Sequence, residues 1–300
     1  MISVLIPVYN FKIKNLIESL LFQFKSIDCE WEILMSDDAS NKDFKSQNLK
    51  FINTLDNNVP IKLFQQEKNL GNAANRNFLI QQANFTWLLF LDADVLPKSN
   101  TFLSVYVSKM QDTLKEIIVG NIVYNCQKPL PHLLRWKYGR KKEQVFLNER
   151  KKHPILHARG ANFAVKREVA KAVNFPILRE NYGFVDTCFF LQFEKNQFCV
   201  VENPVYHLGI ESNAVYLKKI KKAVANALDL LDKNDALAMQ ISLISNYNKV
   251  RIFNKILAKI YVRFHVYFEK NIISNSPSVF IFQLYKLLYM GYLDVVKNTK

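Results

Sequence analysis

The chain has 300 residues, of which 49% are hydrophobic and 22% charged, and it contains only 7 glycines and 9 prolines. A chain of this length and composition can bury a large core, which excludes a wholly disordered protein. Lysine and arginine total 41 and aspartate and glutamate total 26, so the net charge is +15. Such a balance favours anionic partners, namely nucleotides, nucleic acid or a lipid surface.

The four cysteines and the two ends of the chain indicate the cellular compartment of the protein. No cysteine belongs to a C-x-x-C pair or has a histidine at zinc-finger spacing, so we expect buried thiols in a reducing compartment. No signal peptide is evident at the start. The apolar stretch from Ser278 to Val296 includes Lys286 and Asp294, which are costly at a bilayer centre, so we expect no spanning helix and a cytoplasmic protein. The cysteines are Cys29, Cys126, Cys188 and Cys199.

Strand and helix patterns alternate over the first third of the chain. Helices are predicted from Ile13 to Phe24, where apolar residues recur at three- and four-residue steps, and from Asn72 to Ala83. This alternation predicts an α/β fold with a mostly parallel sheet, whose ligands bind beyond the carboxyl ends of the strands. The predicted strands are Ile2 to Val8, Trp31 to Met35, Ile61 to Phe64 and Thr86 to Leu91.

The remainder of the chain predicts a change of architecture. The segment from Asn125 to His157 is rich in basic residues and contains two prolines, and we interpret it as a loop or lid. From Ala214 onward the pattern is almost entirely helical. We therefore expect an α/β domain at residues 1–212 and a helical, basic, amphipathic region at 213–300. Further predicted elements are strands from Glu116 to Tyr124 and Arg159 to Val165, and a helix from Asp186 to Phe193.

Polar residues gather at the ends of the predicted strands. Asp92 and Asp94 follow the fourth strand, where two carboxylates could bind Mg²⁺ or Mn²⁺, although an aspartate there could also cap a helix. The other polar groups are Pro7-Val-Tyr9-Asn10 after the first strand, Asp37-Asp38-Ala-Ser40 after the second, and Asn69-Leu-Gly71 to Arg76-Asn77 before the helix.

This succession resembles the family 2 glycosyltransferases of the GT-A fold, which show P-x-Y-N, D-D-x-S, N-x-G-x-x-x-x-R-N and D-x-D in the same order. The resemblance covers residues 1 to about 210 and implies a three-layer α/β sandwich that uses a nucleotide-diphosphate sugar. It implies that a divalent cation on Asp94 offsets the charge of the departing diphosphate. The resemblance does not identify the sugar that is transferred or the acceptor.

The resemblance also implies roles in donor binding. Asp38 would accept the imide hydrogen of uracil, with helix capping as the alternative, and Pro7 and Tyr9 would lie beside the base, with core packing as the alternative for Tyr9. Gly71, which has no side chain, would allow the backbone to come close to the donor. Arg76 would pair with phosphate or with Asp92, unless it is an ordinary surface arginine.

Three positions in the second half complete the expected site. Asp186 matches the carboxylate that deprotonates the acceptor hydroxyl in inverting members, although Val185 stands where many members have glutamate; a helix cap is the alternative. His207 corresponds to a further metal ligand of galactosyl- and N-acetylgalactosaminyl-transferase types, or is an ordinary hydrogen-bonded histidine. Asn162 is expected to contact the donor sugar.

The C-terminal region is basic and amphipathic. Arg251, Lys255, Lys259 and Arg263 recur at every fourth residue beside apolar positions. These helices could lie on an anionic membrane, at the inner face of the cytoplasmic membrane, or they could pack on the α/β domain with a solvated basic face. The sequence shows no nucleic-acid recognition module, so nucleic acid is not expected as a partner.

These observations together predict an inverting, metal-dependent glycosyltransferase that transfers a sugar from a nucleotide sugar, UDP-linked in our interpretation, to a saccharide or lipid-linked saccharide in surface polysaccharide or glycoconjugate synthesis. A nucleotidyltransferase is the alternative enzyme, but it would carry a Gly-rich basic loop in place of Pro7 to Asn10. A non-catalytic basic scaffold is the other alternative, and the intact Asp38, Asp94 and Asp186 argue against it.

Overall fold

A computed structural model describes residues 1–125, 127, 133–233 and 236–298. The chain divides into two compact units. The first unit comprises Met1–Asn125, Glu143–Pro176 and Gln192–Gly209, and the second comprises Cys126–Lys142, Ile177–Leu191 and Ile210–Lys300. Two segments from the first 212 residues thus cluster with the C-terminal helices.

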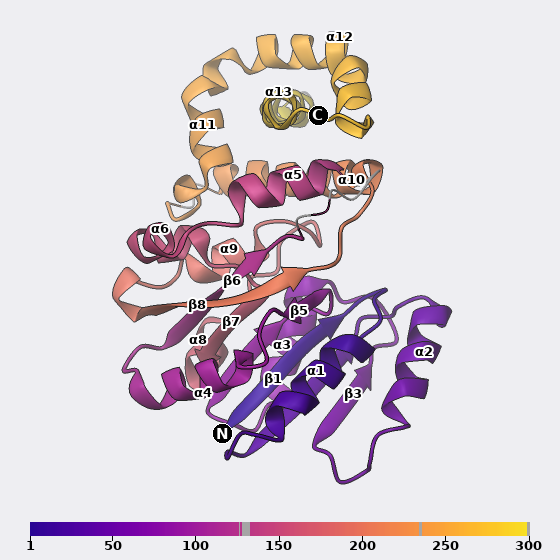
Figure 1. Cartoon of the computed structure of the whole chain (residues 1–300). Helices are drawn as coiled ribbons and strands as arrows, with labels where there is room; N and C mark the ends of the chain where they lie inside the picture. The colour runs from indigo at the N-terminus through magenta and orange to yellow at the C-terminus, as the bar shows by residue number, and fades with distance from the viewer. Residues whose placement is uncertain (126, 128–132, 234–235, 299–300) are drawn as a thin grey trace. The chain divides into compact units, whose positions relative to one another are not determined.

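One sheet of eight strands, within the described residues, organises the first unit (Figure 1). Its order is β3-β2-β1-β4-β7-β6-β8-β5, with β1, β2, β3 and β4 parallel, β6 parallel to β8, and antiparallel pairs at β4–β7, β6–β7 and β5–β8. The expected α/β fold with a mostly parallel sheet is confirmed. The strands are β1 (Ile2–Val8), β2 (Trp31–Asp37), β3 (Ile61–Gln65), β4 (Trp87–Leu91), β5 (Val95–Pro97), β6 (Ile117–Val123), β7 (Asn162–Lys166) and β8 (Phe198–His207).

Central strands of this sheet are buried on both faces, as their unbroken apolar runs require. Val4 and Leu5 of β1 and Leu89 of β4 are fully buried, and Phe90 stacks on Phe163 of β7 with 4.9 Å between ring centroids. Helices surround the sheet (Figure 1). They are α1 (Lys14–Phe24), α2 (Lys42–Ile52), α3 (Asn72–Gln82), α4 (Phe102–Asp112), α6 (Leu147–Lys152), α7 (Pro154–His157), α8 (Arg167–Val173) and the short η1 (Lys195–Gln197).

The second unit is helical, as expected from Ala214 onward, and α13 packs against α5, α10, α11 and α12 (Figure 1). Helix α13 is long and apolar enough to cross a membrane: an 18-residue window of it has a mean hydropathy of 1.4, and 39% of that window is buried within the protein. The elements are α5 (Leu133–Lys142), α9 (Val185–Phe190), α10 (Asn213–Asp232), η2 (Ala238–Gln240), α11 (Ser242–Val250), η3 (Arg251–Phe253), α12 (Asn254–Ile273) and α13 (Val279–Asn298).

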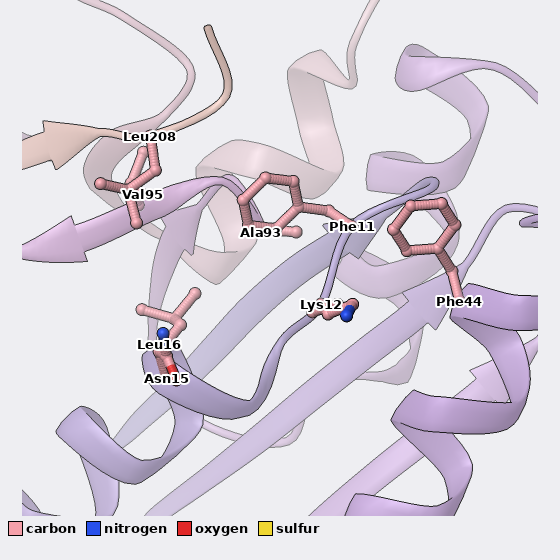
Figure 2. Close-up of a pocket in the computed structure, with 8 residues that line it drawn as sticks. All are labelled: Phe11, Lys12, Asn15, Leu16, Phe44, Ala93, Val95 and Leu208. Carbon is pink, nitrogen blue, oxygen red and sulfur yellow. The ribbon is translucent and has the colours of Figure 1, made fainter.

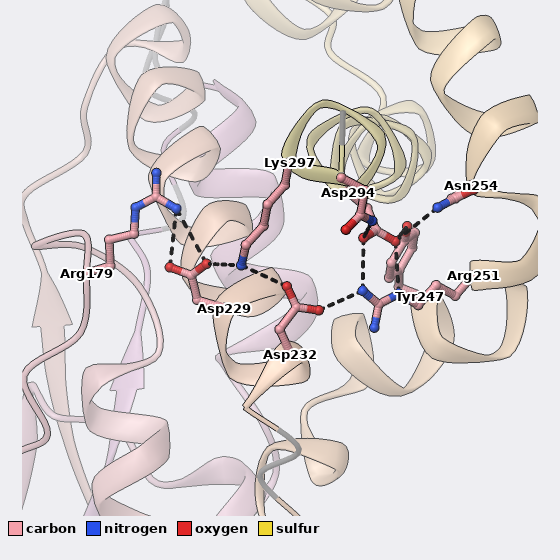
Figure 3. A network of polar contacts seen from close by, with 9 residues as sticks. Arg179, Asp229, Asp232, Tyr247, Arg251, Asn254, Asp294 and Lys297 are labelled. Carbon is pink, nitrogen blue, oxygen red and sulfur yellow. Dashed lines mark hydrogen bonds and ion pairs between the residues drawn. The ribbon is translucent and has the colours of Figure 1, made fainter. Parts of the chain in front are cut away.

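A polar network ties α10, α11, η3 and α13 together (Figure 3). Asp294, which is 1% exposed, accepts hydrogen bonds from the Arg251 guanidinium at 2.9 Å and the Tyr247 hydroxyl at 2.7 Å. Arg251 also donates to Asp232 at 2.6 Å, and Lys297 joins Asp232 to Asp229. Because a buried carboxylate is costly unless paired, these bonds explain how α13 accommodates a charge in its interior face.

Two sequence expectations were wrong. The segment from Asn125 to His157, expected as a loop or lid, contains α5, α6 and α7 in its described part, because Leu133, Leu134 and Trp136 of α5 are buried and its many basic residues had obscured this apolar face. The cysteines were expected to be buried. In the structure the three described cysteines, Cys29, Cys188 and Cys199, are of intermediate exposure, and Cys126 lies outside the described residues.

Candidate functional site

The loops that follow β1 and β2 are bonded to one another. The Asp38 N–H donates to the Val8 carbonyl at 2.8 Å, and the Asn10 N–H donates to the Ser40 hydroxyl at 2.8 Å. Asn10 and Ala39 both adopt positive φ, at 50° and 57°, which turns each loop sharply at the strand end. Pro7 is half-buried in β1, and Tyr9 is 56% exposed, so core packing does not occupy the tyrosine ring.

Asp38 connects the second loop to the third. One of its carboxylate oxygens accepts the Leu70 N–H at 2.6 Å and the other accepts the Gly71 N–H at 3.0 Å. Burial raises the pKa of Asp38 above its usual value, against the lowering effect of these two bonds. Gly71, with φ of 83°, is the N-cap residue immediately before α3. Asp38 therefore anchors the loop before α3, and its contact with a base stays a prediction.

Arg76 lies under the loop that follows β4. Its side chain is 3% exposed, donates to Asp92 at 2.5 Å and to the Gly160 carbonyl at 3.2 Å, and lies over the Phe175 ring. Of the partners expected for Arg76, the structure shows Asp92, and the burial of its guanidinium excludes an ordinary surface arginine. The pair fixes Asp92 beside β7, because Gly160 precedes that strand.

Asp94, in the turn between β4 and β5, and His207, the last residue of β8, lie close to each other. The Nε2 atom of His207 lies 3.8 Å from Oδ2 of Asp94, and the Leu208 N–H donates to the Asp94 carbonyl at 2.7 Å. Pairing of Val95 with His207 in the antiparallel β5–β8 ladder sets this approach. Among the described residues, no group of three histidine, cysteine or acidic side chains could hold a cation.

Two protein donors nevertheless fit a divalent cation of the expected kind. Mg²⁺ is usually held by one or two carboxylates with substrate phosphates and water, and Mn²⁺ accepts both carboxylate and imidazole. Metal–ligand bonds of about 2.1 Å allow two donors 3.8 Å apart to share one ion. The donor set of Asp94 and His207 is therefore compatible with Mg²⁺ or Mn²⁺.

Tyr124 and Glu143, which the sequence analysis did not single out, support His207. The Tyr124 ring stacks on the imidazole with 5.5 Å between centroids and 21° between planes, and its hydroxyl donates to the Glu143 carboxylate. Neither residue belongs to a recognised motif. Only the pairing of β6 with β8, which places Val123 beside Tyr206, brings Tyr124 close to the imidazole.

Asn162 is buried among three strands, with 1% of its surface exposed. Its Nδ2 donates to the carbonyls of Asn121 and Asn203 at 2.9 and 2.8 Å, and its Oδ1 accepts from the Tyr106 hydroxyl at 2.7 Å. These bonds give Asn162 a structural role in the sheet. The expected contact with a sugar stays a prediction.

Asp186 belongs to the second unit, whereas Asp38, Asp94, His207 and the other expected site residues belong to the first. It is the second residue of α9, its Oδ1 accepts the Thr187 N–H at 3.0 Å, and the helix begins after Phe184, which has φ of 66°. Asp186 is therefore not the residue that caps α9, so the capping alternative is not supported. Its catalytic role stays a prediction.

A pocket of about 270 Å³ adjoins the loop that carries Asp94 (Figure 2). Its wall is mostly apolar, Lys12 and Asn15 add polar groups, and Ala93 brings the middle of the Asp92-Ala93-Asp94 turn to its surface. The pocket is partly open to solvent. Its lining residues are Phe11, Lys12, Asn15, Leu16, Phe44, Ala93, Val95 and Leu208.

The chain is similar to known proteins in sequence and in fold. Residues 3–173, more than half of the chain, match the family model described as Glycosyl transferase family 2. No curated protein matches the sequence.

Solved structures share the fold at low sequence identity. The mannosyltransferase PcManGT from Pyrobaculum calidifontis, in complex with GDP-Man and Mn²⁺, has a TM-score of 0.59 and 16% identity, covering 99% of this chain and 86% of that chain. S. aureus TarS 1-349 in complex with UDP-GlcNAc has a TM-score of 0.51 and 15% identity, covering 99% and 92%. A longer S. aureus TarS structure has a TM-score of 0.50 and 19% identity; the match covers 76% of this chain and only 39% of that one.

Proposed function

The chain belongs to glycosyl transferase family 2 and is a glycosyltransferase, and on that basis we propose that it is an inverting, metal-dependent enzyme that uses a UDP-sugar. The observation that supports this proposal best is the distance of 3.8 Å between Asp94 Oδ2 and His207 Nε2. Asp94 lies beyond the end of β4, next to the loops after β1 and β2. A parallel sheet binds its ligands at this edge, where the motif residues gather.

The choice of uracil rests on Asp38. Its carboxylate has acceptor capacity beyond the two N–H groups of Leu70 and Gly71, because an ionised carboxylate offers about four lone-pair directions. An imide N–H could therefore be accepted as well. The exposed ring of Tyr9 is available to stack on a base at the same edge.

Asp94 and His207 would hold Mn²⁺ or Mg²⁺. When bound, such an ion would offset the negative charge that develops on the departing diphosphate. Arg76 keeps Asp92 in place beneath this turn rather than reaching toward the diphosphate, because its guanidinium is bonded to Asp92 and the Gly160 carbonyl. Tyr124 would keep the His207 imidazole oriented.

Asp186 would act as the general base that takes the proton from the acceptor hydroxyl, whose oxygen then attacks the anomeric carbon from the side opposite the diphosphate. Attack from that side inverts the configuration. We propose a saccharide or lipid-linked saccharide as the acceptor, made for surface polysaccharide or glycoconjugates. The basic helices of the second unit support a lipid-linked acceptor.

Isothermal titration of the whole chain with UDP, GDP and CDP, each with and without Mn²⁺, tests the donor proposal without an acceptor. We expect Mn²⁺-dependent binding of UDP alone, and loss of that dependence in Asp94→Asn but not in Asp28→Asn, an exposed control. Equal affinity for UDP in wild type and Asp94→Asn would refute the metal assignment. Preference for GDP would refute the role of Asp38 while leaving the family unchanged.

A further inference from the structure

The segment 251–280 exposes large apolar and basic side chains together. It is fully described and comprises η3, α12 and the first residues of α13, and none of its exposed residues is acidic. Ile252, Tyr267 and Phe280 are 80%, 69% and 77% exposed. Other exposed apolar residues are Phe253, Ile256, Val262, Phe264, Val266 and Ile273, and the exposed basic residues are Lys255, Lys259, Arg263 and Lys270.

Most of these residues lie on one face of α12. At 100° per residue, basic and apolar positions alternate across a single arc of the helix, whereas Ala258, Tyr261 and Ile272 lie on the opposite side and are buried. Helix α12 packs against α13 and α10 within the second unit, so that opposite side is already occupied. We call the arc the α12 outer face: Lys255, Ile256, Lys259, Val262, Arg263, Val266, Tyr267, Lys270 and Ile273.

The single acidic residue of the segment points its charge inward. Glu269 accepts from Lys221 Nζ at 2.8 Å and from the Tyr285 hydroxyl at 2.5 Å, both on neighbouring helices. The four basic residues of the α12 outer face form no ion pair with any described residue. The face therefore has uncompensated positive charge among exposed apolar groups.

We propose that the α12 outer face binds the surface of an anionic lipid bilayer, with the helix axis in the plane of the interface. Basic side chains attract anionic headgroups, and the valine, isoleucine and tyrosine side chains between them enter the boundary with the acyl chains. Twenty residues of α12 provide a contact about 30 Å long. This binding needs no nucleotide and is independent of the proposed function.

Two other occupants fit the face less well. A second copy of the chain would bring two uncompensated positive faces together, which is unfavourable. Nucleic acid would satisfy the lysines and the arginine, but a phosphate backbone offers nothing to the exposed Val262, Val266 and Ile273. A bilayer satisfies both the charge and the apolar groups.

Vesicle flotation of the whole chain tests the proposal, with phosphatidylcholine vesicles that contain or lack phosphatidylglycerol. We expect strong binding only with phosphatidylglycerol. Lys255→Gln, Lys259→Gln and Arg263→Gln together should weaken the partition constant about 100-fold, because each basic residue near an anionic surface contributes roughly fivefold. Val262→Ser with Val266→Ser should weaken it about tenfold or more, without a change of charge.

A matched control variant removes three positive charges from exposed positions of the first unit, and it should bind vesicles as wild type does. Its substitutions are Lys25→Gln, Lys50→Gln and Lys109→Gln. Equal loss in this control, or wild-type binding by either α12 variant, would overturn the proposal. So would a dimer in lipid-free sedimentation that the α12 substitutions abolish, or displacement of the protein from vesicles by duplex DNA. All α12 positions changed are exposed, so circular dichroism should show intact folding.

Discussion

A Cβ atom at Gly209 would lie 1.9 Å from Oδ2 of Asp94 and 2.8 Å from its Cβ. Any side chain at position 209 would therefore displace the Asp94 carboxylate, because atoms do not approach so closely. The backbone after β8 forms one wall of the position that Asp94 occupies opposite His207. Gly209 was not singled out as a site residue from the sequence, where it ends Val205-Tyr-His207-Leu-Gly209.

Gly209→Ala should weaken Mn²⁺-dependent UDP binding by about 10- to 100-fold, which is the usual effect of disturbing a residue that supports a metal ligand. Isothermal titration measures the change. The affinity for UDP without metal and the thermal melting temperature serve as controls and should stay close to wild type. An unchanged metal dependence would show that Asp94 moves without consequence, contrary to its proposed role.

Asp186→Asn should retain UDP binding and lose transfer, because an amide cannot take the proton from the acceptor hydroxyl. We expect kcat to fall by about 100-fold or more, with the nucleotide affinity unchanged. Single-turnover transfer to a saccharide acceptor, compared with titration of UDP, separates the two effects. Loss of UDP affinity in this variant would assign Asp186 to donor binding instead.

Arg76→Met should reduce the free energy of unfolding by about 3 kcal/mol, because it leaves Asp92 and the Gly160 carbonyl without their buried donor. Adding Asp92→Asn should recover part of the loss, since position 92 then no longer has the negative charge that Arg76 balances. Urea unfolding provides the measurement. As a control, Lys14→Met breaks the exposed pair with Glu18 and should cost under about 0.5 kcal/mol.

Lys286→Met should stabilise the protein near neutral pH. Burial, together with the nearby charge of Lys142, lowers the pKa of Lys286 to about 8, and the ammonium lies 5.2 Å from the Tyr138 ring centroid and 5.1 Å from that of Phe282. The cost of burying the charge is complete below the folded pKa and disappears as the pH rises to the ordinary value of 10.5. We expect a gain of about 2 kcal/mol at neutral pH, after allowing for the lost contacts with the rings.

The control for this prediction is Lys25→Met, which removes an exposed charge and should change stability little at any pH. Urea unfolding at neutral pH and above pH 10 gives the comparison. A gain from Lys286→Met that stayed constant across this range would mean that packing, rather than the buried charge, causes it.

Asp294→Asn should destabilise the second unit in a pH-dependent way. Burial alone would raise the pKa of Asp294, but bonds from Arg251, Tyr247 and Asn254 hold it below its ordinary value of 3.8. The stabilisation by this carboxylate is therefore complete above pH 3.8 and is lost as the pH falls through the lower folded value. We expect a loss of about 2 kcal/mol at neutral pH that shrinks in acid. Urea unfolding measures it, with Asp28→Asn as the exposed control.

The α/β unit was predictable because its strands are unbroken apolar runs and because the apolar residues of its helices recur at helical spacing. The segment from Leu133 to His157 was not, because in α5 the buried Leu133, Leu134 and Trp136 stand among five basic residues, and charge hid the apolar face. The side chain of Arg76 had two predicted partners, phosphate and Asp92. Only the position of β7, an antiparallel neighbour of β4, brought Gly160 and Asp92 together around it.

By itself, the sequence determined the fold class, the family and the order of the motifs, since these depend on local apolar patterns and on residues adjacent along the chain. Tertiary structure alone decided that Asp38 holds the loop before α3, that Tyr124 stacks on His207 and that Gly209 lies against Asp94. Each of these relations joins residues distant in sequence. Strand pairing and loop packing set such distances, and no local pattern encodes them.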